Sequence, residues 1–475
     1  MSEEHAHDDC DCASTGIDRR GFVKGCGAAL AFAAAGTSLE TVAAQENSAD
    51  VAELLDPLPS NWGRWGEDDE LGALNLLDGE TAYRGMLAAV QGGPKNVGRF
   101  TLQLSMTGEV INPDPDQPDV LFPNADGSGP QWPSTDTGDP AFPPRTPARR
   151  TNTTGEGGSE VAGGIAFVDD KFAADFFLQG TTHVDALGHA WYGDQIYNGF
   201  STDTTNAVKQ FDTALAGTTN ADAVPDDPAS TLEPFSETTG LSKAGITNAA
   251  EAGIAGRGVL LDVGRHLDVS DEKGRLPLGY GITLEDLQST AEAQGVDVEE
   301  RDILLIRTGA VERTRDPEAE WAPLQEPGLA FSEELVEWFA EKDIPYVGAD
   351  NLAVEKVAQT IDGETYVIPL HGAFLRNLGV TINEILWLKE LGAACAEDGV
   401  YDFLFTAAPL KVERGTGAPV NPVVLKATGR DDDDSPGDDD GENESGDDNG
   451  GQRDDDESDD PPGDDNGGDN DDTDD

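Results

Sequence analysis

The residues best suited to chemistry in this 475-residue chain lie in one short stretch, Phe177-Leu-Gln-Gly-Thr-Thr-His-Val-Asp-Ala-Leu-Gly-His189. The chain has six histidines, and two of them, His183 and His189, lie here. His183 and Asp185 are two residues apart, so on an extended backbone their side chains point the same way. A neutral imidazole and a carboxylate are ligands that suit Zn²⁺ or Mn²⁺. The pair therefore predicts a metal site.

Gln179 and His189 flank this pair and extend the predicted site. We expect an apolar strand to run into a Gly/Thr-rich turn that presents all four side chains. His189 is placed to act as acid or base, because imidazole titrates near working pH. The alternative is a pair of unrelated surface or hydrogen-bonded histidines, and the spacing alone leaves that alternative open.

Alternating β-rich and helical segments are expected to position this stretch. Apolar runs predict strands over 259–263, 303–307, 344–348 and 402–407. A capping-box-like start at Thr283 and a stop at Gly295 predict one helix. Ser332 caps a second helix that runs through Lys342, and a third is expected within 374–391. The interleaving predicts an α/β body in one domain, residues 45–429.

The N-terminal residues 1–44 are typical of a twin-arginine export signal. Arg19-Arg20 is followed by Phe22, Lys24 and a short Ala-rich apolar run, with small residues at 42–44. The run is too short to span a membrane. A chance Arg-Arg before an Ala-rich helix is the alternative. Removal of this segment leaves Cys395 as the one cysteine, which excludes an internal disulfide.

Two further segments differ in composition from the body. Residues 111–160 are dense in Pro, Gly, Asp and Thr, which predicts a surface arm or loop. Residues 430–475 contain 24 acidic and 2 basic residues, which predicts a disordered, solvated tail. The tail lacks the apolar residues and Glu that complete an EF-hand, so we favour a polyanion over calcium loops.

The formal net charge of −64 excludes binding of nucleic acid or of an anionic membrane through a basic face. Like charges on one folded body repel, and molar salt screens that repulsion because the Debye length falls to about 3 Å. The charge therefore favours a salt-adapted exported protein from a high-salt organism over an acidic mesophilic protein. No segment is long and apolar enough to predict a membrane span.

The His183 stretch resembles the metal motif of the cyclase family, His-x-Gly-Thr-His-x-Asp-x-Pro-x-His, a family that includes bacterial kynurenine formamidases and isatin hydrolases. His183, Asp185 and His189 match the second His, the Asp and the third His. Similar stretches follow one another along about 60–427, at 62–75, 303–309, 347–351, 407–412 and 415–419. The resemblance implies one domain with a mixed sheet of the family's swivelling β/β/α type.

The resemblance also implies a ligand set, with one departure. Gln179 stands where the family has its first His, and a neutral carbonyl oxygen suits a harder ion such as Mn²⁺. The distant His and Glu of the family's two-metal arrangement correspond to His371 and Glu384. The implied cofactor is therefore Zn²⁺ or Mn²⁺, one or two ions. The alternatives are a helix–loop contact for His371 and a solvated helix carboxylate for Glu384; His266 is expected to be structural.

The activity that the resemblance implies is metal-assisted hydrolysis of an amide. His189 would move the proton, and Asp185 and Glu384 would bind metal or steer a second proton. The leading substrate is N-formylkynurenine, cleaved to kynurenine and formate, and the rival is a cyclic amide or ester of the isatin type. A non-enzymatic exported surface protein and a decayed site marked by Gln179 are further alternatives. The resemblance to the family also suggests a homodimer or higher homo-oligomer.

Overall fold

A computed structural model describes residues 51–93, 96–106, 150–152, 170–172, 177–210, 237–316 and 318–428. These residues fall within one compact unit, residues 1–430. The predicted export signal, most of the predicted arm and the predicted acidic tail lie outside the described residues.

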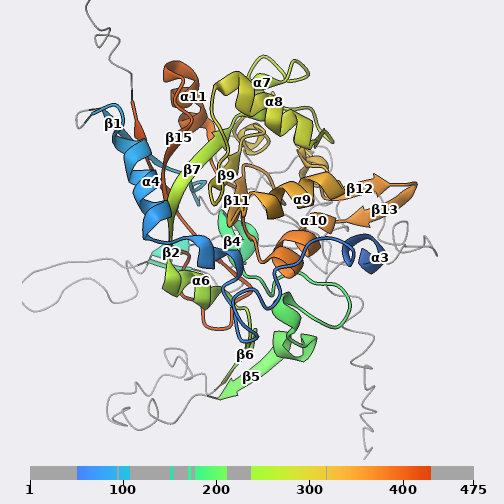
Figure 1. Ribbon diagram of the computed structural model, residues 1–475. Helices are drawn as coiled ribbons and strands as arrows, with labels where there is room; N and C mark the ends of the chain where they lie inside the picture. Colours follow the sequence, from blue (N-terminus) through green and yellow to red (C-terminus); the bar gives the residue numbers. More distant parts are fainter. Residues whose placement is uncertain are drawn as a thin grey trace, which may run out of the picture. The chain divides into compact units, whose positions relative to one another are not determined.

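The largest sheet of the described chain has nine strands in the order β1-β17-β15-β7-β9-β11-β14-β4-β16. Figure 1 shows its central strands β15, β7, β9 and β11 following one another across the molecule. The strands are β1 (Val97–Thr101), β17 (Val423–Ala427), β15 (Asp402–Ala407), β7 (Ile254–Leu261), β9 (Ile303–Ile306), β11 (Tyr346–Ala349), β14 (Thr381–Glu384), β4 (His183–Asp185) and β16 (Gly417–Pro419). Strands β7, β9, β11 and β14 run parallel, and every other neighbouring pair is antiparallel. The predicted α/β class with a mixed sheet is confirmed.

Helices cover both faces of this sheet, because α8 and α9 contribute to the hydrophobic core on one side and α11 to the core on the other. The helices of the described chain are α3 (Val51–Leu55), α4 (Gly79–Val90), α6 (Ile246–Ala252), α7 (Val263–His266), α8 (Leu284–Gln294), α9 (Glu333–Glu341), α10 (Pro369–His371), the π-helix η8 (Gly372–Leu378) and α11 (Lys389–Asp398). Short 3₁₀ helices span Gly72–Leu76, Leu178–Gly180, Tyr197–Gly199, Thr202–Asn206, Val311–Arg315 and Pro323–Gln325. Helix α4 packs across β7, β15 and β17 (Figure 1).

The two faces of the central strands belong to two different hydrophobic cores, because side chains alternate along a strand. In β9, Leu304 joins the core that contains α8 and α9, whereas Leu305 joins the core that contains α11. All four β9 residues are buried, as expected for a parallel strand covered on both sides. In β4, Val184 joins the core that contains α11, so His183 and Asp185 project from the opposite face of the sheet.

Local sequence signals set the helix ends where they were expected. The Thr283 side chain accepts a hydrogen bond from the Asp286 N–H in a capping box, and α8 ends at Gly295 in the left-handed conformation. Ser332 caps α9 through the Leu335 N–H, and Lys342 ends it. Strand β15 covers the predicted 402–407, and β9 and β11 lie within one or two residues of their predicted ranges. The predicted strand 259–263 overlaps β7 only at 259–261: β7 begins earlier, at Ile254, and ends at Leu261, and Val263 begins α7.

The segments around the site differ in part from the prediction. The segment 374–391 contains helical residues, as predicted, at the end of the π-helix and the start of α11, but Gly379, at φ +67°, ends the π-helix, and the β-branched run that starts at Val380 forms β14 between the two helices. Glu384 therefore lies on a strand. Residues 178–180 form a 3₁₀ turn rather than a strand, and the strand is β4, where the turn was expected.

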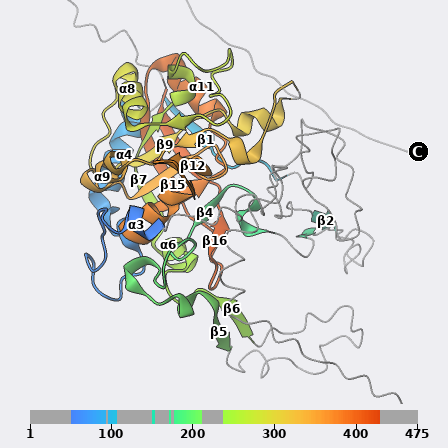
Figure 2. The same cartoon turned by 90° about the vertical axis from the view of Figure 1, so that its right-hand side faces the viewer.

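Four two-stranded ribbons accompany the large sheet. They are β2 (Arg150–Asn152) with β3 (Asp170–Phe172), β5 (Ala207–Gln210) with β6 (Glu237–Gly240), β8 (Gly281–Ile282) with β10 (Gly328–Leu329), and β12 (Ala358–Ile361) with β13 (Glu364–Val367). The β5–β6 ribbon lies apart from the large sheet in both views (Figures 1 and 2). The β12–β13 hairpin matters for the site because it returns the chain to His371.

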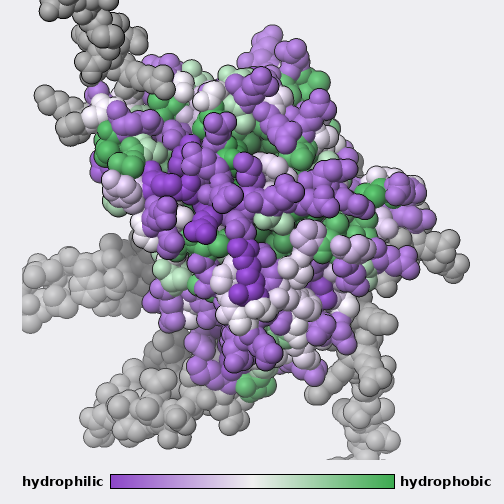
Figure 3. Space-filling model, in the orientation of Figure 1, coloured by the Kyte–Doolittle hydropathy of each residue, from purple (hydrophilic) through white to green (hydrophobic). Residues whose placement is uncertain are grey.

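The face of the molecule seen in Figure 3 is predominantly hydrophilic, with small apolar areas between polar ones. Within the described ranges, no helix combines the length and the apolar character that crossing a bilayer requires.

We expect the melting temperature of the protein to rise as KCl increases from about 0.1 M to about 1 M, because the Debye length shrinks from about 10 Å to about 3 Å. The repulsion being screened is that of a chain with a net charge of −64. Differential scanning calorimetry at several KCl concentrations, with sucrose as an uncharged control, measures this. A melting temperature that is flat or falling in KCl would show that surface repulsion does not limit stability.

Candidate metal centre

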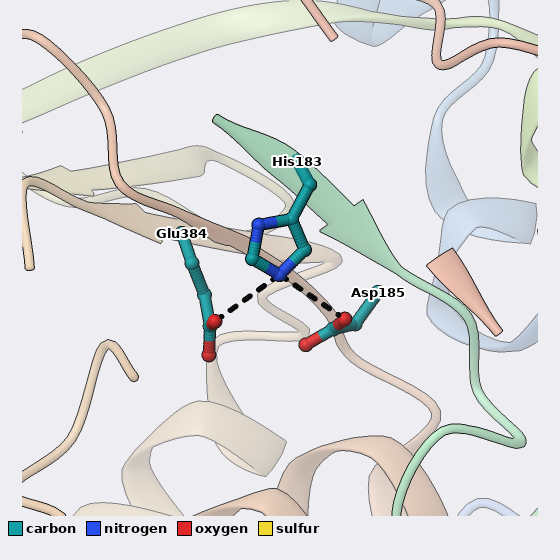
Figure 4. A group of neighbouring side chains, drawn as sticks. All are labelled: His183, Asp185 and Glu384. Atoms are coloured by element: carbon teal, nitrogen blue, oxygen red, sulfur yellow. Dashed lines mark ion pairs between the residues drawn. The ribbon is translucent and has the colours of Figure 1, made fainter. Parts of the chain in front are cut away.

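Two antiparallel strands bring the predicted ligands together. Strand β4 lies between β14 and β16, and Glu384 is directly opposite His183 in the β4–β14 register. Figure 2 shows β4 beside β16. The expected alternation holds, since His183 and Asp185 project from one face of β4. Glu384 joins them on the same face, as Figure 4 shows.

The three side chains form a compact group of potential ligand atoms. The Nε2 atom of His183 lies 3.4 Å from Asp185 Oδ1 and 3.2 Å from Glu384 Oε2. One ligand atom from each residue lies within 4.8 Å of the other two, a spacing that one metal ion can bridge (Figure 4). All three residues are buried.

The buried polar atoms of this group fit a cation better than they fit one another. His183 Nε2 and both carboxylate oxygens of Asp185 have no hydrogen-bond partner, although they lie within ion-pair distance of neighbours. Leaving buried polar groups unpaired is costly. The Nδ1 atom of His183 faces the Thr181 carbonyl oxygen at 2.7 Å, so Nδ1 donates and Nε2 carries the lone pair of a neutral ring. The donor set suits a divalent metal.

His371 completes the group from a different part of the chain. It ends α10, and its Nε2 lies 3.1 Å from Glu384 Oε1 and 3.9 Å from Asp185 Oδ2. Its Nδ1 lies 2.8 Å from Glu355 Oε1. His371 therefore faces the two carboxylates of the group with one ring nitrogen and a third carboxylate with the other.

The group attracts positive charge. Burial lowers the pKa of His183, but Asp185 and Glu384 outweigh this and raise it to about 9. Burial likewise lowers the pKa of His371, and Glu355 and Glu384 raise it to about 10. Burial raises the pKa of the Glu384 carboxyl, yet its contacts with the two imidazoles hold that pKa well below its usual range. A divalent cation supplies the same positive charge without protonating the imidazoles.

His189 lies at the more open side of the group. Its Nε2 is 3.8 Å from Asp185 Oδ1, and its side chain is 25% exposed, whereas that of His183 is 0% exposed. The His189 and His371 rings are 6.4 Å apart. His189 is thus close enough to interact with Asp185 and open enough to meet a substrate.

Gln179 lies next to Asp185 on the β16 side. Its Nε2 donates to Thr416 Oγ1 at 2.7 Å. A Cβ placed on Gly417 would lie 3.0 Å from Gln179 Nε2 and 3.2 Å from Asp185 Oδ1, so these two side chains flank that glycine. Coordination by Gln179 stays a prediction, as does the metal-ligand role of the other four residues.

Two supporting residues were not predicted from the sequence. Glu355 bonds His371, and Asn383 donates to the His183 carbonyl oxygen at 2.6 Å while accepting from the Tyr346 hydroxyl at 2.6 Å. Asn383 is the sequence neighbour of Glu384, and this adjacency could have indicated that Asn383 lies near the site. Glu355 lies 16 residues before His371 with no motif connecting the two.

Comparisons with known proteins show which family and which solved structures this chain resembles. The profile of a family described as "Putative cyclase" matches residues 122–356. A crystal structure described as a novel cyclase is 29% identical, with a TM-score of 0.56, and covers 80% of this chain and 100% of that chain. Isatin hydrolase A from Labrenzia aggregata (15% identity, TM-score 0.38, 70% of this chain and 94% of that chain) and from Ralstonia solanacearum (16%, 0.38, 70% and 92%) are also similar. A search of curated proteins finds no match.

Proposed function

This chain belongs to the cyclase family, and from that premise we propose that it is a metal-dependent hydrolase that cleaves an amide C–N bond. The observation that carries the proposal is the set of unpartnered lone pairs on His183 and Asp185, buried beside Glu384 and His371. A buried group of this kind is unfavourable by itself and favourable around a cation.

The ion would be held by His183, Asp185, His371 and Glu384, with Gln179 as a further candidate. The set contains two carboxylates and two imidazoles, which suits Mn²⁺ or Zn²⁺. When bound, such an ion supplies Lewis-acid chemistry: it polarises a carbonyl and makes water more acidic.

His189 moves the proton in the proposed reaction. Its half-open position lets Nε2 take a proton from the attacking water and return it to the nitrogen that leaves. Asp185 Oδ1, 3.8 Å away, stabilises the imidazolium between these steps. Water oxygen bonds to the carbonyl carbon, the C–N bond breaks, and the amine departs with the transferred proton.

The proposed substrates are aryl formamides, with N-formylkynurenine as the leading case, because the His183 motif resembles that of kynurenine formamidases. Cleavage releases formate and an aryl amine. The reaction needs a substrate that brings its formyl carbonyl close to Asp185 and its nitrogen within reach of His189.

A substrate panel tests this proposal. The purified protein, loaded with Mn²⁺ or Zn²⁺ in molar KCl, is incubated with N-formylkynurenine, formanilide and isatin, and formate and ring-opened product are measured. We expect formate release from the first two substrates. Ring opening of isatin alone would support the cyclic-amide rival over the aryl formamides. A metal-loaded protein that cleaves none of the three would contradict the proposed activity.

A further inference from the structure

Glu355 holds His371 from the side opposite the proposed ion. Glu355 is 2% exposed and lies just before the β12–β13 hairpin. Its Oε1 accepts hydrogen bonds from the His371 backbone N–H at 2.7 Å and the His371 Nδ1–H at 2.8 Å. Its Oε2 accepts from the Leu370 N–H at 2.9 Å and from Gln359 Nε2 at 3.0 Å. Four donors therefore surround one buried carboxylate.

Two of these donors are the first backbone N–H groups of the helix that carries His371. The residue before that helix, Ile368, is in the left-handed conformation (φ 44°, ψ 50°) and provides no side-chain cap. The first N–H groups of a helix need an acceptor, and a negative charge is favoured there. Glu355 accepts from both the Leu370 and the His371 N–H groups, and the His371 N–H also donates to the Ile368 carbonyl oxygen at a longer 3.2 Å. The carboxylate thereby fixes the position of the His371 backbone.

The same carboxylate determines which ring nitrogen of His371 faces the ion. A carboxylate only accepts hydrogen bonds, so Nδ1 must carry a proton, and in a neutral ring Nε2 then carries the lone pair. Nε2 is the nitrogen that lies 3.1 Å from Glu384 Oε1. His183 has the same orientation, with the Thr181 carbonyl oxygen as its acceptor.

We propose that Glu355 is a positioning residue for metal binding: it caps the helix of His371, fixes its tautomer and directs its Nε2 toward Asp185 and Glu384. This inference rests on the proposed function, because it requires His371 to bind the ion. A carboxylate partner also makes the imidazole a stronger donor to metal.

Replacing Glu355 with glutamine tests the proposal with almost no change in volume. The amide nitrogen must face either the two His371 donors or the Leu370 and Gln359 donors, so one pair loses its acceptor. Gln359 cannot turn its own amide to compensate without losing the bond from the Phe331 N–H to its Oε1. We expect Glu355→Gln to bind Mn²⁺ or Zn²⁺ about 10–100-fold more weakly than the wild type, measured by chelator competition.

Glu326→Gln is the matched control. Glu326 is also 2% exposed and accepts hydrogen bonds from Trp321 Nε1 at 2.7 Å and the Leu352 N–H at 2.6 Å. It makes the same kind of buried contacts without touching His371. We expect this variant to keep wild-type metal affinity, so any loss specific to Glu355→Gln reports on His371 rather than on a buried carboxylate in general.

A spectroscopic measurement on the wild type keeps the proposal falsifiable even if Glu355→Gln does not fold. In metal-loaded protein labelled with ¹⁵N-histidine, and with His371 assigned by its absence in His371→Ala, we expect the proton on Nδ1 and the ion on Nε2. The opposite arrangement would overturn the proposal, as would equal metal affinity of folded Glu355→Gln and wild type. Wild-type protein that binds no ion would instead refute the proposed function.

Discussion

Replacing Asp185 with asparagine is expected to remove the bound ion and to lower kcat/KM by at least about 10³-fold. Asp185 is the carboxylate that all three histidines of the site approach: its oxygens lie 3.4 Å, 3.8 Å and 3.9 Å from the Nε2 atoms of His183, His189 and His371. Asparagine keeps the shape and loses the charge. Removal of one preorganised electrostatic group typically costs about 10²–10³-fold, and loss of the ion adds to this.

The control for this variant is Asp203→Asn, which makes the same charge change at an exposed residue of the 3₁₀ helix Thr202–Asn206. Metal content and formamide hydrolysis are measured for both variants, and near-ultraviolet circular dichroism checks that they are folded. Full activity and full metal content in folded Asp185→Asn would exclude this residue from the site. The control is expected to match the wild type.

Replacing His189 with alanine is expected to lower kcat by about 10²–10⁴-fold while leaving the metal content unchanged. The His189 side chain is more exposed than those of His183 and His371, and it approaches the site through Asp185 at 3.8 Å. His183 and His371 are buried and lie beside the Glu384 carboxylate. The expected separation of activity from metal content distinguishes a proton-transfer residue from a ligand.

The same substitution at His266, which lies in the last turn of α7, is the control. His266→Ala removes an imidazole with no contact to the predicted site and should hydrolyse formanilide at the wild-type rate. If His189→Ala is as fast as the wild type, another group moves the proton. If His189→Ala loses the ion, His189 acts as a ligand, and the proposed division of roles is wrong.

Much of the site was predictable because it depends on local spacing. The two-residue interval between His183 and Asp185 requires one face of a strand, and β4 has that form. The capping signals of α8 and α9 also act over a few residues, and both helices begin as predicted. These are short-range rules, and the tertiary structure did not override them.

The parts that local patterns did not predict depend on long-range contacts. The family resemblance pointed to Glu384, but the strand that carries it, β14, was not predicted, because its segment has a Leu and Phe content that resembles a helix; Glu384 reaches the site because β14 pairs with β4. Glu355 contacts His371 because the β12–β13 hairpin between them returns the chain to Glu355. No local sequence pattern predicts that contact. A three-residue strand such as β4 acquires its neighbours from the whole sheet rather than from its own sequence.

Elemental analysis of the purified protein after dialysis into molar KCl tests the central claim most directly. A catalytic centre built from His183, Asp185, His371 and Glu384 is expected to retain about one or two Mn²⁺ or Zn²⁺ ions per chain, and Asp185→Asn none. Acidic surface groups would release such ions to the competing salt. A wild-type protein that retains no more transition metal than Asp185→Asn, even after incubation with both metals, would contradict the account.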